Sequence, residues 1–185
     1  ARLLELNPDL LAAGAARHAG EDTGGRHDVA ETRDRQVATH VDLKALPKEG
    51  AILWGNPKGP KLVVFSDFQC GYCKRLTGEL EKAGVLVEER PISIFGASSR
   101  RRSEAVLCAA DPIGALHAAY TGKHLEPRAA CKKAAALDAN EAFAKANGFA
   151  GTPVIVRARD GAVLHGYRDA AAIRRFVAEG KGEAQ

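Results

Sequence analysis

Cys70 and Cys73, two cysteines separated by two residues, are the side chains whose type and spacing most directly suggest chemistry. A pair at this spacing can exchange disulfides, because one thiolate attacks a disulfide and the second thiol closes a ring and releases the product. A free cysteine has a pKa of about 8.5, so only a small fraction is thiolate at neutral pH. The pair therefore needs surroundings that lower the pKa of the attacking thiol.

The residues around the pair predict such surroundings. The apolar, β-branched run 62–65 predicts a strand, and a helical pattern over 71–83, ended by Gly84, follows the first cysteine at once. A cysteine at a helix start lies beside unpaired backbone N–H groups and the positive end of the helix dipole, both of which favour a thiolate. We therefore predict Cys70 as the attacking thiol and Cys73, one turn further and more buried, as the resolving thiol.

The two residues inside the motif, Gly71 and Tyr72, bear on the direction of exchange. A tyrosine cannot supply the positive charge that a histidine would, so the thiolate is stabilised less and the disulfide is less strongly oxidising. Tyr72 thus favours shuffling or reduction over forceful oxidation.

Thr152-Pro153 forms the second element of the predicted site. Cis X–Pro bonds make up only about 5–6% of such bonds, so the cysteine pair supplies the reason to expect one here. An ordinary strand-entry proline is the alternative. We predict that Gly71, Tyr72, Thr152 and Pro153 bind substrate, with the Thr152 backbone free to pair with an extended chain.

The remaining cysteines, Cys108 and Cys131, complete a total of four. Structural zinc sites usually contain two close ligand pairs, and only one pair is close here, so no metal site is predicted. A disulfide that closes the loop between them would stabilise the fold by roughly 3 kcal/mol, and two buried free thiols are the alternative. Two disulfide-forming pairs indicate an oxidising compartment.

Composition sets wider bounds on this chain of 185 residues with a net charge of +4. Its length suits one domain with an appendage. No apolar run is long enough to span a membrane, and no signal peptide is visible, which fits a mature or trimmed chain. The basic run 100–102 has no aromatic residues interleaved, so a solvated helix start is favoured over nucleic-acid binding.

The order of elements predicts an α/β, thioredoxin-like fold with a helical insertion. Strands, a helix, a further strand region, a helical block and a final hairpin with one helix are expected, in chain order, at 51–54, 61–66, 71–83, 85–94, 96–150, 154–164 and after Asp169. Within the block, Ser98 or Ser99, Asp111 and Asp138 are expected to cap helices.

Two domains are predicted, a short N-terminal segment and linker over 1–40 and a catalytic domain over 41–185. The first segment carries several leucines and reads as one or two short helices that pack on the main domain or on a second chain. A loosely ordered terminus is the alternative.

Taken together, these motifs resemble the catalytic domain of bacterial periplasmic thiol–disulfide isomerases of the DsbC/DsbG type. The similarity spans about 41–180 and lies in the runs 63–73, 107–111, 122–123, 137–140, 151–153 and 161–167. It implies Cys70 as the attacking thiol, Cys73 as the resolving thiol, a structural Cys108–Cys131 disulfide and a cis-proline platform at Thr152-Pro153.

The resemblance also implies an activity and partners. A periplasmic disulfide isomerase or reductase would act on misoxidised secreted proteins, use no cofactor and be reduced by a membrane thiol reductase of the DsbD type. Family members carry a β-rich dimerisation domain, and residues 1–40 show no strand alternation. Monomer and homodimer thus both stay open, as do a dithiol oxidase and a chaperone-like binding module.

One departure concerns proton transfer. Thioredoxin itself has a buried acid six residues before its first cysteine, and Val64 occupies that position here. Proton transfer to or from Cys73 would then need another group or water. Asp67 is a weak candidate that is also placed to cap the helix.

Overall fold

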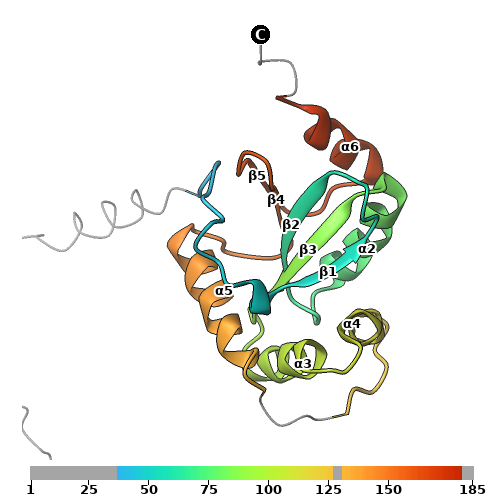
Figure 1. Cartoon of the computed structure of the whole chain (residues 1–185), viewed down its shortest axis with the longest axis vertical. Coiled ribbons are helices and arrows are strands. Elements are labelled where there is room, and N and C mark those ends of the chain that lie inside the picture. Colours follow the sequence, from blue (N-terminus) through green and yellow to red (C-terminus); the bar gives the residue numbers. More distant parts are fainter. Residues whose placement is uncertain (1–36, 127–130, 181–185) are drawn as a thin grey trace, which may run out of the picture. The chain divides into compact units, whose positions relative to one another are not determined.

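The computed structural model describes residues 37–126 and 131–180, so most of the predicted N-terminal segment lies outside the described residues. Figure 1 shows the elements, which are η2 (Lys48–Gly50), β1 (Ile52–Gly55), β2 (Lys61–Ser66), α2 (Gly71–Ala83), β3 (Leu86–Pro91), α3 (Ala97–Leu107), α4 (Pro112–Tyr120), α5 (Ala134–Ala146), β4 (Val154–Arg157), β5 (Val163–His165) and α6 (Ala170–Ala178). The predicted order of elements is confirmed.

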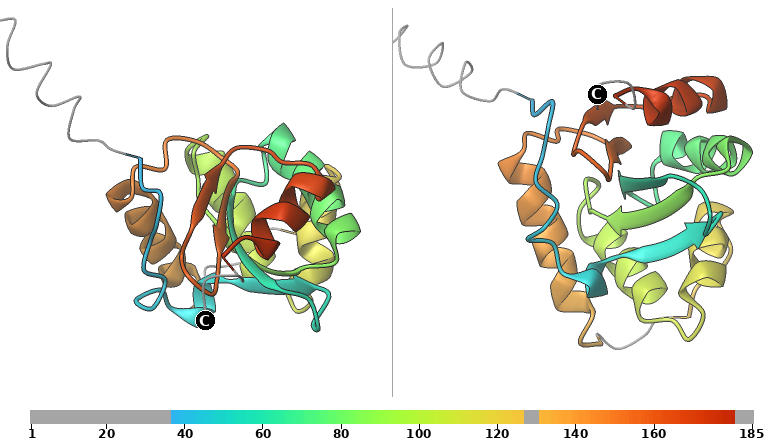
Figure 2. Two further views of the ribbon diagram at one scale, coloured as in Figure 1. Left: turned by 90° about the horizontal axis from the view of Figure 1, so that it is seen from above. Right: turned by 45° about the horizontal axis from the view of Figure 1, so that its top comes forward.

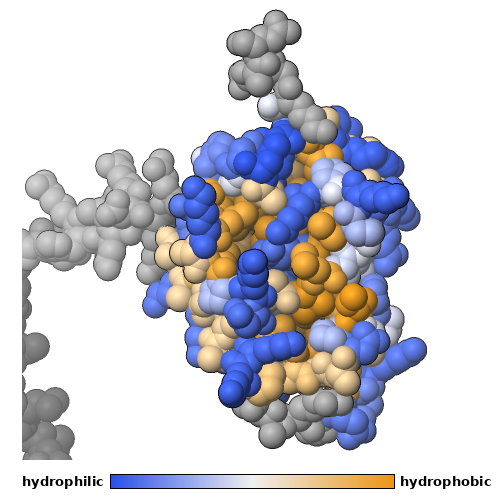
Figure 3. All heavy atoms as spheres, in the orientation of Figure 1, coloured by the Kyte–Doolittle hydropathy of each residue, from blue (hydrophilic) through white to orange (hydrophobic). Residues whose placement is uncertain are grey.

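Five strands form one sheet in the order β1-β3-β2-β4-β5. β2 and β3 run parallel through the α2 crossover, and the other neighbouring pairs are antiparallel. Figures 1 and 2 show α5 on one side of the sheet and α2 with α6 on the other. Figure 3 shows hydrophobic patches between hydrophilic residues on the face seen in Figure 1.

The central strand β2 explains why both faces of the sheet are covered. Leu62 and Val64 pack into a core cluster with residues of α2, α3, α4 and α6, and Val63 and Phe65 pack into a second cluster with α5. A strand buried on both faces reads as a continuous apolar run rather than as an alternation. The strand therefore ends rigidly just before the cysteine motif.

The strand after α2 differs from the prediction. One strand region over 85–94 is predicted from the apolar runs 85–87 and 91–94, and the structure has a shorter strand, β3, that runs through Glu88, Glu89 and Arg90 and ends at Pro91. This charged run conceals the strand in the sequence because a buried charge needs partners that only the folded chain supplies. Its polar side chains find such partners, as described below.

Two predicted helix caps are wrong. α3 follows Gly96, so neither Ser98 nor Ser99 is its N-cap. α5 starts at Ala134, so Asp138 lies inside the helix. Serine and aspartate are common N-cap residues, but their presence near a helix start does not fix the cap position. Packing in the folded chain decides at which residue each helix begins.

Two other predicted caps are confirmed. Asp111 accepts a hydrogen bond from the Gly114 N–H at the start of α4, and Asp169 accepts one from the Ala172 N–H at the start of α6. None of the helices in the described part of the chain is long and apolar enough to cross a membrane.

Candidate active site

Cys70 is the N-cap residue of α2 and has an extended backbone conformation. Its N–H donates to the Asp67 carbonyl at 2.9 Å, and its carbonyl accepts from the Lys74 N–H at 3.1 Å. The Cys70 side chain is only 7% exposed, and its Sγ lies 3.6 Å from the Thr152 carbonyl oxygen. The sulfur is thus held between the start of a 13-residue helix and a loop 82 residues further along the chain.

Cys73 lies one turn into α2 and is 2% exposed. Both motif cysteines are free thiols in the structure. Burial raises the pKa of the Cys73 thiol, and the opposing contributions of the Thr152 side chain and the Asp67 backbone do not overcome it. A thiol with a raised pKa must lose its proton before it can attack, so the site needs a group that receives this proton.

The Thr152-Pro153 peptide bond is cis in the structure. The loop is held to the hairpin by the Gly166 N–H, which donates to the Pro153 carbonyl at 2.8 Å. A groove of about 280 Å³ runs along this loop, lined by residues that include Val37, Thr152, Pro153 and His165. The groove is connected to Cys70 through Thr152, which lines it and whose carbonyl oxygen contacts the Cys70 sulfur.

Tyr72 projects from the motif and is 58% exposed. The Arg75 guanidinium carbon lies 5.8 Å from the centre of the Tyr72 ring and 5.1 Å from that of Tyr167. Aromatic rings stacked with a cation offer a broad contact surface at low conformational cost. Arg75 carries no signal in the sequence, because the partner ring at Tyr167 is brought to it only by folding.

A second groove, of about 320 Å³, lies on another side of Cys70. Its lining includes Gln69, Lys74, Arg102 and Tyr120. The Arg102 guanidinium donates to the Ala119 carbonyl at 2.9 Å, which fixes α3 against α4 at this groove. Cys70 itself lines this second groove, whereas it meets the first groove only through the contact of its sulfur with Thr152.

Asp67 is fully buried and structural. Its carboxylate accepts hydrogen bonds from the Gln69 N–H at 2.8 Å, the Ser99 hydroxyl at 2.8 Å and the Phe95 N–H at 3.3 Å. It does not cap α2, because Cys70 holds that position and no side chain caps it. The residue instead ties the motif loop to the start of α3.

Glu89 is a buried acid that the sequence analysis does not single out. It is 2% exposed and accepts hydrogen bonds from the Trp54 indole N–H at 2.7 Å, from the Ser66 hydroxyl at 2.7 Å and from the Tyr120 hydroxyl. Burial raises the pKa of its carboxyl group. In the sequence, an acid between Glu88 and Arg90 is typical of a solvated loop, so no signal marks it.

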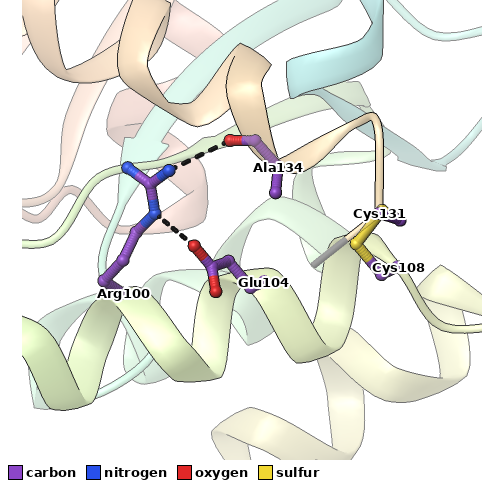
Figure 4. The surroundings of a disulfide bond; sticks show 5 residues. All are labelled: Arg100, Glu104, Cys108, Cys131 and Ala134. Carbon is purple, nitrogen blue, oxygen red and sulfur yellow. Dashed lines mark hydrogen bonds and ion pairs between the residues drawn. A yellow bond between two sulfur atoms is a disulfide. The ribbon is translucent and has the colours of Figure 1, made fainter. Parts of the chain in front are cut away.

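Away from these residues, the structure joins Cys108 and Cys131 in a disulfide with a Cα–Cα distance of 5.8 Å. Figure 4 shows this bond between the end of α3 and the residues before α5. Nearby, Arg100 binds Glu104 at 2.8 Å and the Ala134 carbonyl at 3.1 Å. The disulfide and Arg100 therefore connect the same two helices.

Comparison with known proteins gives relatives of one kind. No family model matches the chain. The thiol:disulfide interchange protein DsbC of Salmonella typhimurium is 29% identical over 167 residues, which are 85% of this chain and 66% of that protein. DsbC of Dickeya dadantii is 30% identical over 154 residues, 78% of this chain and 63% of that protein. The chain thus spans about two thirds of the length of these relatives.

Solved structures agree on the fold. A disulfide interchange protein from Neisseria gonorrhoeae superposes with a TM-score of 0.63 and 25% identity, over 74% of this chain and 99% of that chain. Proteus mirabilis ScsC in a compact conformation gives a TM-score of 0.62 at 21% identity, over 84% of this chain and 86% of that chain, which shows the fold.

The fold and the cysteine pair at the start of α2 define a thioredoxin-like thiol–disulfide oxidoreductase. Within this class, the chain is similar to the thiol:disulfide interchange proteins of the DsbC type, and the resemblance predicted from its motifs is confirmed.

Proposed function

We propose that the protein isomerises and reduces disulfides in misoxidised secreted proteins, with Cys70 as the attacking thiol and Cys73 as the resolving thiol. The observation that carries this proposal is the position of Cys70, an N-cap residue whose sulfur lies 3.6 Å from the carbonyl of a cis-proline loop. Helix-terminal N–H groups favour the thiolate there, and the loop offers a backbone for substrate.

The exchange has two stages. The Cys70 thiolate attacks one sulfur of the substrate disulfide, the substrate S–S bond breaks, and the other substrate sulfur leaves as a thiolate. The resulting mixed disulfide is then resolved in one of two ways. A second substrate thiolate attacks the substrate sulfur and regenerates Cys70, which is isomerisation, or the Cys73 thiolate attacks the Cys70 sulfur, which reduces the substrate and leaves a Cys70–Cys73 disulfide.

We assign substrate binding to Gly71, Tyr72, Thr152 and Pro153. An extended substrate segment along the groove beside Thr152 would pair with its backbone and bring its disulfide to Cys70. Tyr72, with its exposed ring, would contact the flanking side chains of the substrate.

Refolding of a scrambled, disulfide-bonded ribonuclease tests the cysteine roles, with Cys70→Ser and Cys73→Ser as a matched pair. Cys70→Ser should lose the activity. Cys73→Ser should retain part of it and accumulate mixed disulfides with substrate, because only the intramolecular resolution is lost. Full refolding activity in Cys70→Ser would overturn the proposal.

The partners and the compartment follow from the same proposal. We place the protein in the periplasm, where a membrane thiol reductase of the DsbD type would return the Cys70–Cys73 disulfide to thiols. Trapping the thiols of the protein in cells should show Cys70 and Cys73 reduced when such a reductase is present and oxidised when it is deleted. A pair that stays oxidised in both strains would point instead to a dithiol oxidase.

The predicted oligomerisation segment lies mostly within residues 1–36, outside the described structure. Light scattering on the full chain would therefore decide between a homodimer and a monomer. Aggregation suppression that survives loss of both motif cysteines would support a chaperone-like binding module.

A further inference from the structure

We propose that Glu89 accepts, through the hydroxyl group of Tyr120, the proton that Cys73 loses when it attacks the mixed disulfide. This inference rests on the proposed function, because it concerns the resolving step of that reaction. It assigns a residue on β3 to a task for which the sequence offers only Asp67, whose carboxylate is instead hydrogen-bonded to Gln69, Phe95 and Ser99.

The position of Glu89 in the sheet is the first argument. Val64 on β2, which occupies the place of the buried acid of thioredoxin, is the register partner of Glu89 on the parallel neighbour β3. Residues paired across adjacent strands project from the same face of the sheet, about 5 Å apart. The Glu89 carboxylate therefore enters the same core that an acid at position 64 would enter, but it does so from the neighbouring strand.

The surroundings of Glu89 are the second argument. Trp54, Val64, Cys73 and Tyr120 belong to one buried cluster, and three of the elements around Glu89 each give it a hydrogen bond, β1 through Trp54, β2 through Ser66 and α4 through Tyr120. The Tyr120 ring also packs edge-on against Phe68, with ring centres 5.0 Å apart, in the loop that leads to Cys70. The Tyr120 side chain thus joins the acid to the cysteine motif.

The charges that face Glu89 are few. Cys73 reaches the cluster from α2, Tyr120 and His117 from α4, and the hydrogen-bond donors from β1 and β2 are uncharged. Within 37–126 and 131–180, no Lys or Arg side chain forms an ion pair with Glu89, and Arg90 binds Glu88 instead. A buried carboxylate that, among these residues, has no ion pair and only the His117 imidazole as a nearby charge is costly, which makes it a candidate for a chemical role.

The titration of these groups supports the transfer. Burial raises the pKa of Glu89 and that of the Cys73 thiol, so the cluster resists a negative charge on either group. Burial, together with the charges of Glu89 and Cys73, also raises the pKa of Tyr120. Transfer of a proton from Cys73 to Glu89 moves one charge within the cluster instead of creating a second.

The step is balanced as follows. Cys73 and Tyr120 lie in one buried cluster without a direct hydrogen bond between them, so the Cys73 thiol gives its proton to the Tyr120 oxygen through one water molecule while the Tyr120 hydroxyl proton passes to the Glu89 carboxylate. The Cys73 thiolate attacks the Cys70 sulfur, the Cys70–substrate S–S bond breaks, and the substrate leaves as a thiolate. Cys70 and Cys73 are oxidised to a disulfide and the substrate is reduced. Because Glu89 acts through Tyr120, it is a positioning residue and not a catalytic one.

A chromogenic aromatic disulfide separates the two chemical steps in the full chain. The first coloured thiol released reports attack by Cys70, and the second reports resolution by Cys73. In Glu89→Gln the second release should slow by roughly a hundredfold at neutral pH, because the group that finally takes up the Cys73 proton is lost. Its rate should rise in proportion to hydroxide concentration, since solvent must take the proton. The first release should stay within about twofold of the unmodified protein.

Glu88→Gln is the matched control, because it makes the same substitution one residue away on the opposite face of β3. It should leave both releases and their pH profiles unchanged. Tyr120→Phe keeps the carboxylate and the ring, and it should reproduce the slow second release. It also serves as the test if Glu89→Gln does not fold.

An unchanged second release and pH profile in Glu89→Gln or in Tyr120→Phe would overturn the inference. Equal slowing in Glu88→Gln would also overturn it, because that result would indicate a general loss of packing. Failure of the proposed function looks different, since the first release would then persist in Cys70→Ser.

Discussion

Glu89 and Arg90 are neighbours on β3, and the strand sends their side chains into opposite cores. Arg90, 3% exposed, binds Glu88 at 2.9 Å, the Pro47 carbonyl at 2.9 Å and the Asn140 side-chain oxygen at 3.1 Å. Glu89 is equally buried but has uncharged donors around it. The charge of Arg90 is neutralised by an ion pair with Glu88, whereas Glu89 forms no ion pair with any residue that the structure describes. We take this difference to distinguish a charge with a structural role from one that a reaction can use.

On the Arg90 side of the sheet, the buried side chains of Arg90 and Asn140 both have hydrogen-bond partners. Asn140 is fully buried on α5 and donates to the Gly50 carbonyl at 2.8 Å and the Pro91 carbonyl at 3.2 Å while it accepts from Arg90. The arginine, the amide and the carbonyls thus lock α5, η2 and β3 together. Removal of Arg90 would leave the Pro47 carbonyl and the Asn140 side-chain oxygen without this donor.

Arg90→Met should give the largest effect. It leaves Asn140 and the Pro47 carbonyl short of a donor and Glu88 short of one cation, which should lower the free energy of unfolding by about 4 kcal/mol. Denaturant unfolding measures this, with the exposed Arg174→Met as a control that should change it by no more than about 0.5 kcal/mol. A loss as small as in the control would remove the contrast between the two residues.

Loss of the disulfide should rank next. Cys108→Ala with Cys131→Ala frees the loop before α5, the helix that carries Asn140, and should lower the free energy of unfolding by about 3 kcal/mol. The two thiol releases of the exchange assay should keep their rates in buffer, because the hydrogen bond from Arg102 to the Ala119 carbonyl still holds α3 against α4 on the Glu89 side of the sheet. Slower release at full folding would show that the two sides are coupled.

Trp54→Phe should have a smaller effect. It removes the indole donor to Glu89 while keeping an aromatic ring, which should lower the free energy of unfolding by about 1–2 kcal/mol at neutral pH. The lost hydrogen bond favours the ionised carboxylate, so the pKa of Glu89 should rise further. Carboxyl titration followed by infrared spectroscopy measures the change, and a pKa that falls would contradict it.

Glu89→Gln should give the smallest effect on stability, with the opposite sign. The folded-state pKa of Glu89 is raised, so above the unfolded value of about 4.3 the folded state holds the extra proton and the acid costs stability as pH rises. The free energy of unfolding of the variant, relative to that of the unmodified protein, should be about 1 kcal/mol higher at pH 8 than at pH 4. Unfolding curves at both pH values test this.

Glu88→Gln provides the mirror image of that pH dependence. Burial alone would raise the pKa of Glu88, but the hydrogen bond from Lys61 and the charge of Arg90 lower it overall. Its stabilising contribution is therefore present above the unfolded pKa and is lost as pH falls through the folded one. This variant should lose stability at neutral pH and approach the unmodified protein in acid, and the same slope in both variants would break the comparison.

The sequence predicts the parts of the molecule that local rules govern. The bounds of α2, the Asp111 and Asp169 caps and the cysteine motif all depend on residues a few positions apart. The strand β3 and its acid depend on contacts with Trp54 and Tyr120, residues 35 and 31 positions away. Periodicity treats Glu89 as solvated, because nothing next to it in the chain reveals the donors that the fold supplies.

The shielding of Cys70 has a consequence for which disulfides the protein can select. With 7% of the residue exposed and the sulfur against the Thr152 carbonyl, an incoming S–S bond must protrude from its own chain to be reached. Bridges enclosed within a finished native protein cannot do so, whereas wrongly paired ones in loose chains can. Accessibility alone would then select wrongly paired disulfides for attack. Correct disulfides would accumulate because, once buried, they can no longer contact the Cys70 sulfur.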